Sequence, residues 1–381
     1  MDDHTPHALT HAAGDHGKAR PASQSSLLKH VAPEEIPASE ELLSPEVLEA
    51  HLVGLSEPAP SIIAGGDIML GGRSRKPIAE HGADYPFAAV RPLLKRAPIV
   101  VANLEGPLAR HAKKESRNYS YRVHPKLASS LQRAGISVVT LANNHLLDCG
   151  REGVLETIEA LAAAGVRSIG AGIDDKSARA PVILQSGPYR VGLLGYYWNR
   201  RTAATSSRPG SAMDTLPVLA SDIRDLRTRA DRIVVMFHWG LPYEREPFPE
   251  DRAKARFAID CGADVVIGHH PHVIQPLEVY RGCLIAYSLG NFAFGSGNSL
   301  AESLLVAIRF EDFQTICHVY PVYVKNRDRR VDYQPKPVQG VSAAKILNRL
   351  AESSGLSGIL DVGNARGTLV LPRVIRSGGA E

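Results

Sequence analysis

The sequence is poor in cysteine, with only Cys149, Cys261, Cys283 and Cys317 among its 381 residues. None of these residues forms a Cys-x-x-Cys pair, so neither a zinc knuckle nor the disulfide framework of a small secreted protein is expected. Their expected role is that of small buried apolar side chains. A chain of this length can bury a large core without covalent cross-links.

Long apolar runs and runs of one charge are also missing. No stretch of about 18 apolar residues occurs, so no membrane-spanning helix is predicted. The formal net charge of +4 is spread over mixed signs, which argues against nucleic acid as a partner. The first residues, Met1-Asp2-Asp3-His4, are acidic where a signal peptide would be basic and then apolar. We therefore expect a cytoplasmic protein with no membrane partner.

Composition divides the chain into three regions. Residues 1–58 are rich in Pro, Ala, Ser, Glu and His and predict a flexible or loosely docked N-terminal arm, with a helical pattern over residues 45–55. Residues 59–330 predict the catalytic domain, and residues 331–381 a C-terminal extension with one helix. Four histidines of the arm are more typical of a solvated tail than of a metal site. They are His4, His7, His11 and His16.

Short apolar runs alternate with amphipathic patterns along the central region, which indicates an α/β fold. The predicted strands are 62–64, 99–102, 138–142, 191–195, 233–237, 265–267 and 284–287, followed by longer strands at 305–310 and 316–324. The predicted helices are 126–134, 153–164, 221–229, 251–261 and 343–351.

Side chains of metal-binding type follow five of these strands. The segment Gly268-His269-His270-Pro271-His272 places three imidazoles within four positions after an apolar run. Ligands of open α/β sheets collect at the carboxyl ends of strands, so these side chains are expected to meet. Oxygen and nitrogen donors of this kind suit one or two divalent cations of the Mn, Fe, Zn or Ca class, with no organic cofactor. The donors are Asp67, Glu105, Asn144, His145, His238, His270 and His272.

Each motif taken alone has a second interpretation. Gly65-Gly66-Asp67 is also a common turn, and a lone histidine such as His238 is more often structural. In the segment from Asn143 to Asp148, one Asn or Asp could simply be the N-cap of the helix that follows, although an N-cap does not explain the whole cluster. Tyr287 to Phe292 would either shape the same pocket or form a tight turn. The agreement of several strand ends favours a single metal centre.

Six motifs in order resemble the CapA/PgsA-type capsule-synthesis family, a branch of the calcineurin-like metallophosphoesterases. They are Gly-Asp-Ile-Met, Asn-Leu-Glu-Gly-Pro, Leu-Ala-Asn-Asn-His-x-x-Asp, His-Trp-Gly, Gly-His-His-Pro-His and Tyr-Ser-Leu-Gly-Asn-Phe, within about residues 60–325. The resemblance implies an α/β fold, a four-layer α/β/β/α sandwich of the calcineurin-like metallophosphoesterase type.

The resemblance also implies roles for individual residues. The implied metal ligands are Asp67, Glu105, Asn144, His238, His270 and His272. His145 would be the acid/base group, oriented by Asp148. Epimerisation would need a second proton-transfer group, either His269 or Asp148. Arg122 has two interpretations: it binds a substrate carboxylate, or it forms a surface salt bridge. The other candidates for substrate contacts are Asn103, Trp239, Ser288 and Asn291.

Two positions depart from the pattern of this superfamily. Its opening Asp-x-His is here Asp67-Ile68-Met69, and a thioether is a poor ligand for a hard cation, so one metal site is expected to be weak or absent. Leu241-Pro242-Tyr243 stands where acidic residues often follow His-Trp-Gly, which predicts a changed substrate.

Together with the absence of an apolar anchor, these departures favour a resemblance to CapA-like enzymes that epimerise lasso peptides. The leading hypothesis is epimerisation of an α-carbon, such as that of a C-terminal Trp, in a ribosomally made precursor peptide with a leader. A metal pair would stabilise the enolate-like charge, while one group removes the proton and another returns it. The alternatives are a metal-dependent phosphoesterase and a poly-γ-glutamate capsule biosynthesis subunit. The oligomeric state stays open.

Overall fold

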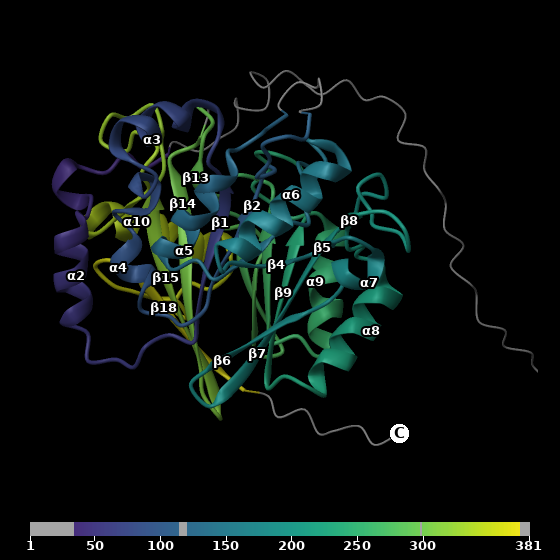
Figure 1. Cartoon of the computed structure of the whole chain (residues 1–381). Coiled ribbons are helices and arrows are strands. Elements are labelled where there is room, and N and C mark those ends of the chain that lie inside the picture. Colours follow the sequence, from purple (N-terminus) through teal and green to yellow (C-terminus); the bar gives the residue numbers. More distant parts are fainter. Residues whose placement is uncertain (1–33, 114–119, 298, 374–381) are drawn as a thin grey trace, which may run out of the picture. The chain divides into compact units, whose positions relative to one another are not determined.

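A computed structural model of the chain describes residues 34–113, 120–297 and 299–373. Two β-sheets lie face to face in this part (Figure 1). The larger sheet contains β1 (Ile62–Met69), β2 (Val100–Leu104), β3 (Val138–Thr140), β4 (Arg167–Ile169), β13 (Asn291–Phe294), β14 (Glu302–Phe310), β15 (Gln314–Tyr323), β16 (Lys336–Pro337), β17 (Asp361–Val362) and β18 (Gly367–Pro372). The smaller sheet contains β6 (Val182–Ser186), β7 (Tyr189–Tyr197), β9 (Arg232–His238), β10 (Val265–His269), β11 (Leu277–Tyr280) and β12 (Cys283–Ala286).

Helices and a small third sheet complete the described part. The α-helices are α2 (Pro45–Val53), α3 (Arg75–His81), α4 (Arg91–Leu94), α5 (Ala128–Ala134), α6 (Gly150–Ala163), α7 (Asp175–Ala178), α8 (Leu216–Arg227), α9 (Pro249–Cys261) and α10 (Gly340–Ser353). The third sheet pairs β5 (Ala171–Gly172) with β8 (Gly210–Ser211).

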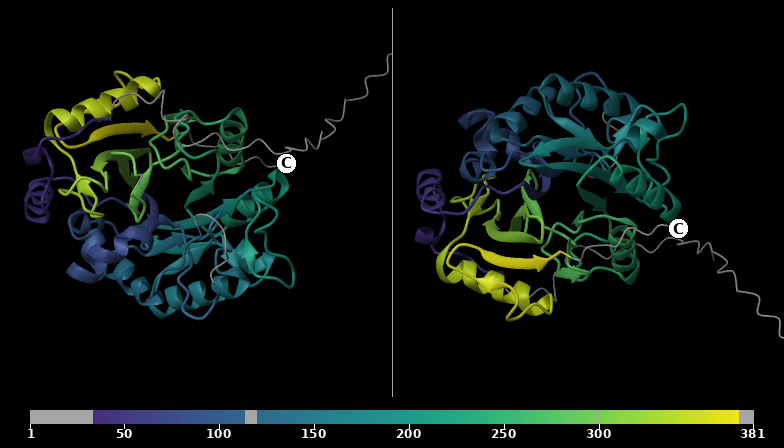
Figure 2. Two further views of the ribbon diagram at one scale, coloured as in Figure 1. Left: turned by 90° about the horizontal axis from the view of Figure 1, so that it is seen from above. Right: turned by 90° about the horizontal axis from the view of Figure 1, so that it is seen from below.

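The order of strands brings distant parts of the chain together. In the larger sheet β1, β2, β3 and β4 are parallel neighbours, and β14 pairs with β1 in the antiparallel sense. In the smaller sheet β7, β9, β10 and β12 are parallel neighbours. Segments coloured purple and blue therefore lie beside green and yellow ones in both views of Figure 2. Parallel strands point their carboxyl ends to one edge, and this edge carries the candidate site.

Both faces of the larger sheet are buried. Ile62 and Ala64 of β1 face the smaller sheet, whereas Ile63 between them faces the helices, and all three side chains are fully buried. Val234 and Ile267 meet them from the smaller sheet. A strand buried on both faces must be apolar at consecutive positions, which explains the unbroken apolar runs in the sequence.

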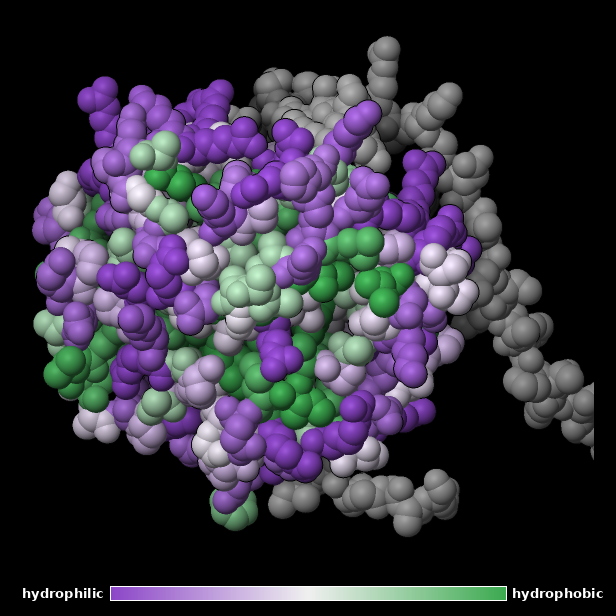
Figure 3. Space-filling view, in the orientation of Figure 1, coloured by the Kyte–Doolittle hydropathy of each residue, from purple (hydrophilic) through white to green (hydrophobic). Residues whose placement is uncertain are grey.

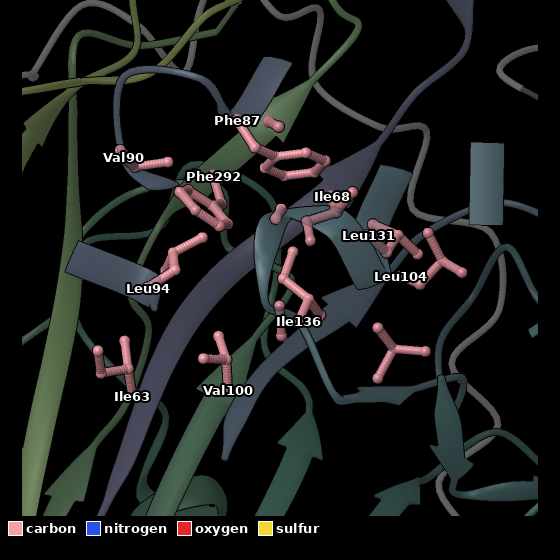
Figure 4. Close-up of a cluster of buried hydrophobic side chains, with 14 of the residues drawn as sticks. Ile63, Ile68, Phe87, Val90, Leu94, Val100, Leu104, Leu131, Ile136 and Phe292 are labelled. Carbon is pink, nitrogen blue, oxygen red and sulfur yellow. The ribbon is translucent and has the colours of Figure 1, made fainter. Parts of the chain in front are cut away.

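The outer faces of the two sheets are covered by separate sets of helices. Leu94 of α4 and Leu131 of α5 pack with Val100 and Leu104 of β2 (Figure 4). On the other side, α8 and α9 bury apolar side chains such as Leu219 against the smaller sheet. The layers are thus helices, sheet, sheet, helices, and the predicted four-layer α/β/β/α sandwich is confirmed.

The surface of the sandwich is polar with local exceptions. The face drawn in Figure 3 is mostly hydrophilic, with an apolar patch below its centre, where β6 and β7 pass in Figure 1. Val182 and Leu184 of β6 are only partly buried and pack against the core between the sheets. No helix in residues 34–113, 120–297 or 299–373 has both the length and the apolar character needed to cross a membrane.

The segments before and after the central region pack onto the sandwich. Leu48 and Leu52 of α2 are buried in the core under the larger sheet. At the other end of the chain, β18 pairs with β15 over six residue pairs, and Leu347 of α10 packs into the core between the sheets. The four tail histidines predicted to be solvated lie outside the described residues.

Every predicted strand and helix is present, with shifted ends. The largest shifts are at β1, which runs five residues further to Met69, and at α8, which begins at Leu216 instead of residue 221. Some elements were not predicted, among them β6, β11 and β18. β13 begins where the sequence suggested a pocket-shaping segment or a tight turn, and it is a strand that pairs with β1. Its few residues carry too little periodicity to identify a strand.

One buried histidine outside the candidate site makes the stability depend on pH. His318 of β15 lies 3.1 Å from a carboxylate oxygen of Glu57, and burial, with the nearby charge of Arg366, lowers its pKa to about 4. The unfolded chain takes up this proton near pH 6.5, but the folded chain does not. Between about pH 6.5 and pH 4, acidification should therefore lower the free energy of unfolding by up to about 1.4 kcal/mol per pH unit from this group. Denaturant unfolding of the metal-free protein at several pH values measures this effect. The free energy of unfolding should fall less steeply with acidification in His318→Gln than in the wild type, and equal slopes for the two proteins would show that His318 is not the cause.

Candidate metal centre

The candidate ligands converge where the carboxyl ends of strands from both sheets meet. Asp67 lies in β1, Glu105 directly follows β2, and His238 ends β9. These three side chains are at most 1% exposed and form the floor of the site. Four partly exposed side chains border them, from the loops that follow β3 and β10. They are Asn144, His145, His270 and His272.

Two glycines explain how β1 delivers Asp67. The pairing of β1 with β2 shifts between Ala64 and Asp67, as it does at a β-bulge, which re-aims side chains and is common beside active sites. At Gly66 a Cβ atom would lie 1.9 Å from the carbonyl oxygen of Gly290, so a side chain cannot fit. Only glycine at position 66 allows this close approach of the two backbones.

Two groups of three side chains share Glu105. Its carboxylate lies with His238 and His270 in one group, and with Asp67 and His272 in the other. Within each group, one ligand atom per residue lies within 4.8 Å of the others. Glu105 Oε1 is 3.4 Å from His238 Nε2, and Glu105 Oε2 is 3.8 Å from His272 Nε2. The carboxylate therefore stands between two ligand sets.

The polar atoms of Glu105 and His270 test whether cations fit. Both oxygens of Glu105 and Nδ1 of His270 are buried and have no hydrogen-bond partner among the described residues. Burial raises the pKa of Glu105 well above its usual range. A buried, unpaired carboxylate is costly unless a positive charge compensates it. These residues therefore fit one or two divalent cations.

Neighbouring amides orient the group that contains Asp67. Asn103 donates a hydrogen bond of 2.8 Å to Asp67, and His272 Nδ1 lies 3.1 Å from the other Asp67 oxygen. Burial lowers the pKa of His272, but the nearby Glu105 and Asp67 outweigh it and raise this pKa to about 9. The side chain of Asn291 lies 3.0 Å from His272 Nδ1. Asn103 and Asn291, predicted to contact substrate, thus hold ligands in place.

The group that contains His238 is built from neutral imidazoles. Burial and the neighbouring His270 hold the pKa of His238 well below its usual range, and burial lowers the pKa of His270 to about 3. The side-chain oxygen of Asn144 lies 2.9 Å from His238 Nε2, and the ring of Tyr197 lies 5.4 Å from the His238 ring. A neutral imidazole can bind a cation without first losing a proton.

A histidine and an aspartate stand next to these groups. His145 Nδ1 lies 2.7 Å from an Asp148 oxygen, which also accepts a hydrogen bond from the Tyr121 backbone N–H. The Tyr121 ring lies 4.4 Å from the His145 ring. With Nδ1 held by the carboxylate, Nε2 of His145 is left to accept or donate a proton. The expected pairing of His145 with Asp148 is present.

The turn after β10 is strained. His270 has φ of 98° and His272 has φ of 58°, and both values lie where non-glycine residues are uncommon. Strained backbone of this kind is typical of functional sites because the surrounding structure must hold it. The turn directs both imidazoles to Glu105, one to each group.

Three predicted site residues are directed away from the cluster. Trp239 is 1% exposed, donates to the Tyr287 carbonyl and stacks on Phe237 in the core under the helices. Ser288 is fully buried and donates to the Val273 carbonyl. These two predicted substrate contacts are corrected to structural positions, because both side chains are buried and donate to backbone carbonyls.

His269 is the third of these residues. Its side chain is 1% exposed, and its Nε2 lies 3.1 Å from the Gly65 carbonyl oxygen. It faces the core between the sheets, so the predicted role of His269 in proton transfer is not supported. Arg122 is exposed and donates to the Ala112 carbonyl, and its contact with a substrate carboxylate stays a prediction.

The sequence interpretation missed several aromatic side chains around the centre. The centre of the Phe294 ring lies 4.8 Å from the centre of the His272 ring. The Tyr243 ring, from the connection that follows β9, lies 6.4 Å from the His272 ring. Tyr197 is 4% exposed, and burial raises its pKa to about 12. Tyr197 and Phe294 are the last residues of β7 and β13, and this position was a usable signal because strand ends also supplied the ligands. Met69, where an imidazole was expected, accepts a hydrogen bond from the Gly71 backbone.

Comparisons with known proteins found a matching family and several similar sequences. Residues 61–296 match the family described as bacterial capsule synthesis protein PGA_cap. The chain is 34% identical to the capsule biosynthesis protein CapA of Bacillus anthracis over 285 residues, 72% of this chain and 68% of that protein. It is 32% identical to the PGA biosynthesis protein CapA of Bacillus subtilis over 61% of this chain and 62% of that protein.

A more distant relative and a solved structure extend the comparison. A probable polyglutamine synthesis accessory protein of Mycobacterium tuberculosis is 34% identical over 45% of this chain and 48% of its own length. The crystal structure of TT1561 of Thermus thermophilus covers 65% of this chain and 94% of its own, with a TM-score of 0.39 and 16% identity.

Proposed function

This chain belongs to the bacterial capsule synthesis family, and from that premise we propose that it is a metal-dependent hydrolase of an acidic glutamyl chain. The observation that carries the proposal is the buried, unpaired Glu105 carboxylate, which joins two ligand groups beside one His–Asp pair. Hydrolysis needs one acid/base group, whereas epimerisation needs one on each side of a carbon. Because His269 is directed into the core, His145 is the better-supported proton-transfer group, and hydrolysis is the better-supported reaction.

Different residues have different roles in this proposed reaction. Asp67, Glu105, His238, His270 and His272 would hold the cations, with Asn144 beside His238. Divalent cations held there would polarise a substrate oxygen and make a water molecule more acidic. His145 Nε2 takes a proton from the attacking water and passes it to the leaving nitrogen, while Asp148 holds the ring orientation. The water oxygen bonds to the carbonyl carbon, and the C–N bond breaks.

Charge and relatives support an acidic chain as the substrate. Arg73, Arg75 and Arg122 are exposed: Arg73 lies in the turn after β1, Arg75 begins α3, and Arg122 lies in the segment after β2. Arg75 donates to the Arg122 carbonyl, so α3 and this segment lie together. Arginine keeps its charge at every physiological pH and binds carboxylates with two parallel hydrogen bonds. The name of one relative refers to PGA biosynthesis.

Cleavage of a defined polymer tests the proposal. Purified full-length protein is stripped with chelator, reloaded with Mn²⁺, Zn²⁺, Fe²⁺ or Ca²⁺, and incubated with poly-γ-glutamate of known length. New amino groups and shorter chains by mass spectrometry are expected only with a cation. His238→Ala should lower the rate more than about 100-fold, because losing a ligand should cost more than losing an outer-shell partner. His111→Ala, at an exposed histidine outside the cluster, should leave the rate unchanged.

Two outcomes would count against this function. An intact polymer in the presence of bound cation contradicts the hydrolysis of glutamyl amides. Turnover of an aryl phosphate alone, run in parallel, would assign the centre to phosphoester hydrolysis instead.

Peptide epimerisation is a second candidate, supported by Tyr243. Its ring lies 6.4 Å from the His272 ring, so a second proton donor stands near the cluster besides His145. In this reaction one group removes the α-proton of a C-terminal residue and the other returns a proton from the opposite side. A lasso-type precursor peptide incubated with the metal-loaded protein in heavy water should gain one deuterium at that α-carbon. No gain, with cation bound, would eliminate this candidate without affecting the hydrolase proposal.

A further inference from the structure

His269 connects the two sheets directly behind the candidate metal centre. It is the last residue of β10, pairs in register with His238 of β9, and faces the larger sheet. Its Nε2–H donates to the Gly65 carbonyl of β1 over 3.1 Å. Gly65 lies two residues before Asp67, and His269 directly precedes His270. One hydrogen bond thus joins the backbone that carries Asp67 to the turn that carries His270 and His272.

The partner of this bond lies at the irregular part of β1. Between Ala64 and Asp67, β1 contains one residue more than the facing part of β2. Such an extra residue disrupts the ladder of backbone hydrogen bonds and bends the strand. A carbonyl buried there needs a donor from elsewhere. His269 supplies this donor at the point where the strand turns Asp67 towards the centre.

His269 itself belongs to neither ligand group. Among the described residues, the groups that could hold a cation contain His238, His270 and His272 but not His269. Its Nε2 donates to the Gly65 carbonyl, and its ring also lies against the Phe237 backbone. The side chain is therefore placed to act through the backbone and not as a ligand.

We infer that His269 is a positioning residue, which sets the separation between Asp67 and the His270–His272 turn and thereby the affinity of the centre for cations. The inference rests on the metal-binding part of the proposed function. Asp67 and His272 form one ligand group, yet they come from different sheets. The His270 backbone N–H and His272 Nδ1 also contact Asp67, at 3.4 and 3.1 Å. Without the bond from His269 to Gly65, these contacts alone would set the distance between Asp67 and the turn, so the geometry of this ligand group would change first.

A pair of amide variants tests the inference. Gln at position 269 is long enough to donate to Gly65, whereas Asn is too short to reach it. Co²⁺ is the probe, because its absorption spectrum reports ligand geometry and its affinity is measured by competition with a chelator. His269→Asn should weaken Co²⁺ binding about 10- to 100-fold, as outer-shell partners of metal ligands do. It should also change the spectrum, and His269→Gln should recover most of both.

A matched control separates positioning from general stability. Ser186 of β6 is buried and donates to the Ser61 carbonyl, which directly precedes β1, so it also links the two sheets, but at their other end. Ser186→Ala should lower the thermal stability and leave the Co²⁺ affinity and spectrum unchanged. If His269→Asn does not fold, His269→Phe takes its place, with circular dichroism as the check on folding.

The possible results separate the two ideas. Wild-type Co²⁺ affinity and spectrum in His269→Asn would overturn the inference, and so would a His269→Gln variant that binds no better. If Ser186→Ala weakens Co²⁺ binding as much as His269→Asn does, the effect comes from lost stability, and the inference is overturned as well. A wild-type protein that binds no Co²⁺ would instead contradict the proposed function.

Discussion

The Glu105→Gln variant is expected to lose both cation sites at once. Glu105 is the one side chain common to the two ligand groups, and its carboxylate is fully buried. Glutamine keeps the shape but removes the charge and one ligand oxygen. We expect the affinity for Mn²⁺ or Zn²⁺ to fall more than about 100-fold, beyond the range for outer-shell partners. Metal content after dialysis, measured by elemental analysis, should fall to near zero, and catalysis should be lost with it.

Thermal unfolding provides a second measurement of the same variant. A cation present at about 100 times its dissociation constant stabilises a folded protein by about 2.7 kcal/mol, so the wild-type melting temperature should rise on adding metal. The Glu105→Gln melting temperature should not respond. Without metal, the variant should be at least as stable as the wild type, because it no longer buries an unpaired carboxylate.

A second buried carboxylate serves as the control for Glu105. Glu302 is 6% exposed and pairs with Arg349. Glu302→Gln should lower the stability and keep the cation sites. Full metal content in Glu105→Gln would show that Glu105 does not join two sites.

The His145→Ala variant is expected to keep its cations and lose turnover. His145 belongs to neither ligand group, yet it directly follows Asn144, whose oxygen lies 2.9 Å from His238. Removing a general acid/base typically slows a reaction about 10²- to 10⁴-fold. We expect a fall in kcat of that size with unchanged metal content. The assay is cleavage of poly-γ-glutamate or, for the second candidate, deuterium uptake.

Asp148→Asn is the graded companion of this variant. Asp148 is 4% exposed and holds His145 Nδ1, so its loss should impair the orientation of the ring without removing it. We expect a smaller fall in kcat than for His145→Ala. Loss of metal from His145→Ala, or an unchanged kcat, would remove His145 from the proposed mechanism.

The sequence predicted much of the fold because the strands are buried on both faces. Runs such as Val234 to Phe237 are apolar at every position and are followed directly by polar residues, so both the strand and its end can be recognised. The short strands β11 and β18 were missed, although each contains three apolar residues. Their place depends on the partners β12 and β15, which supply the hydrogen bonds.

The candidate ligands were predictable for a related reason. Asp67, Glu105, His238, His270 and His272 each stand at or just after a strand whose end points to the same edge. The directions of their neighbours were not predictable. Trp239 and His269 adjoin ligands in the sequence, but they face the helices and the space between the sheets.

The sequence by itself determined which chemistry is available: carboxylates and imidazoles at the ends of apolar strands, in an order typical of one family. Only the tertiary structure decided how the histidines of Gly268 to His272 divide their roles. His269 is the last residue of β10 and faces the space between the sheets, where its Nε2 meets the Gly65 carbonyl of β1. The left-handed backbone of His270 and His272 then turns both imidazoles to Glu105. That backbone is held by contacts between the two sheets, from segments about 200 residues apart, as in the bond from His269 to Gly65.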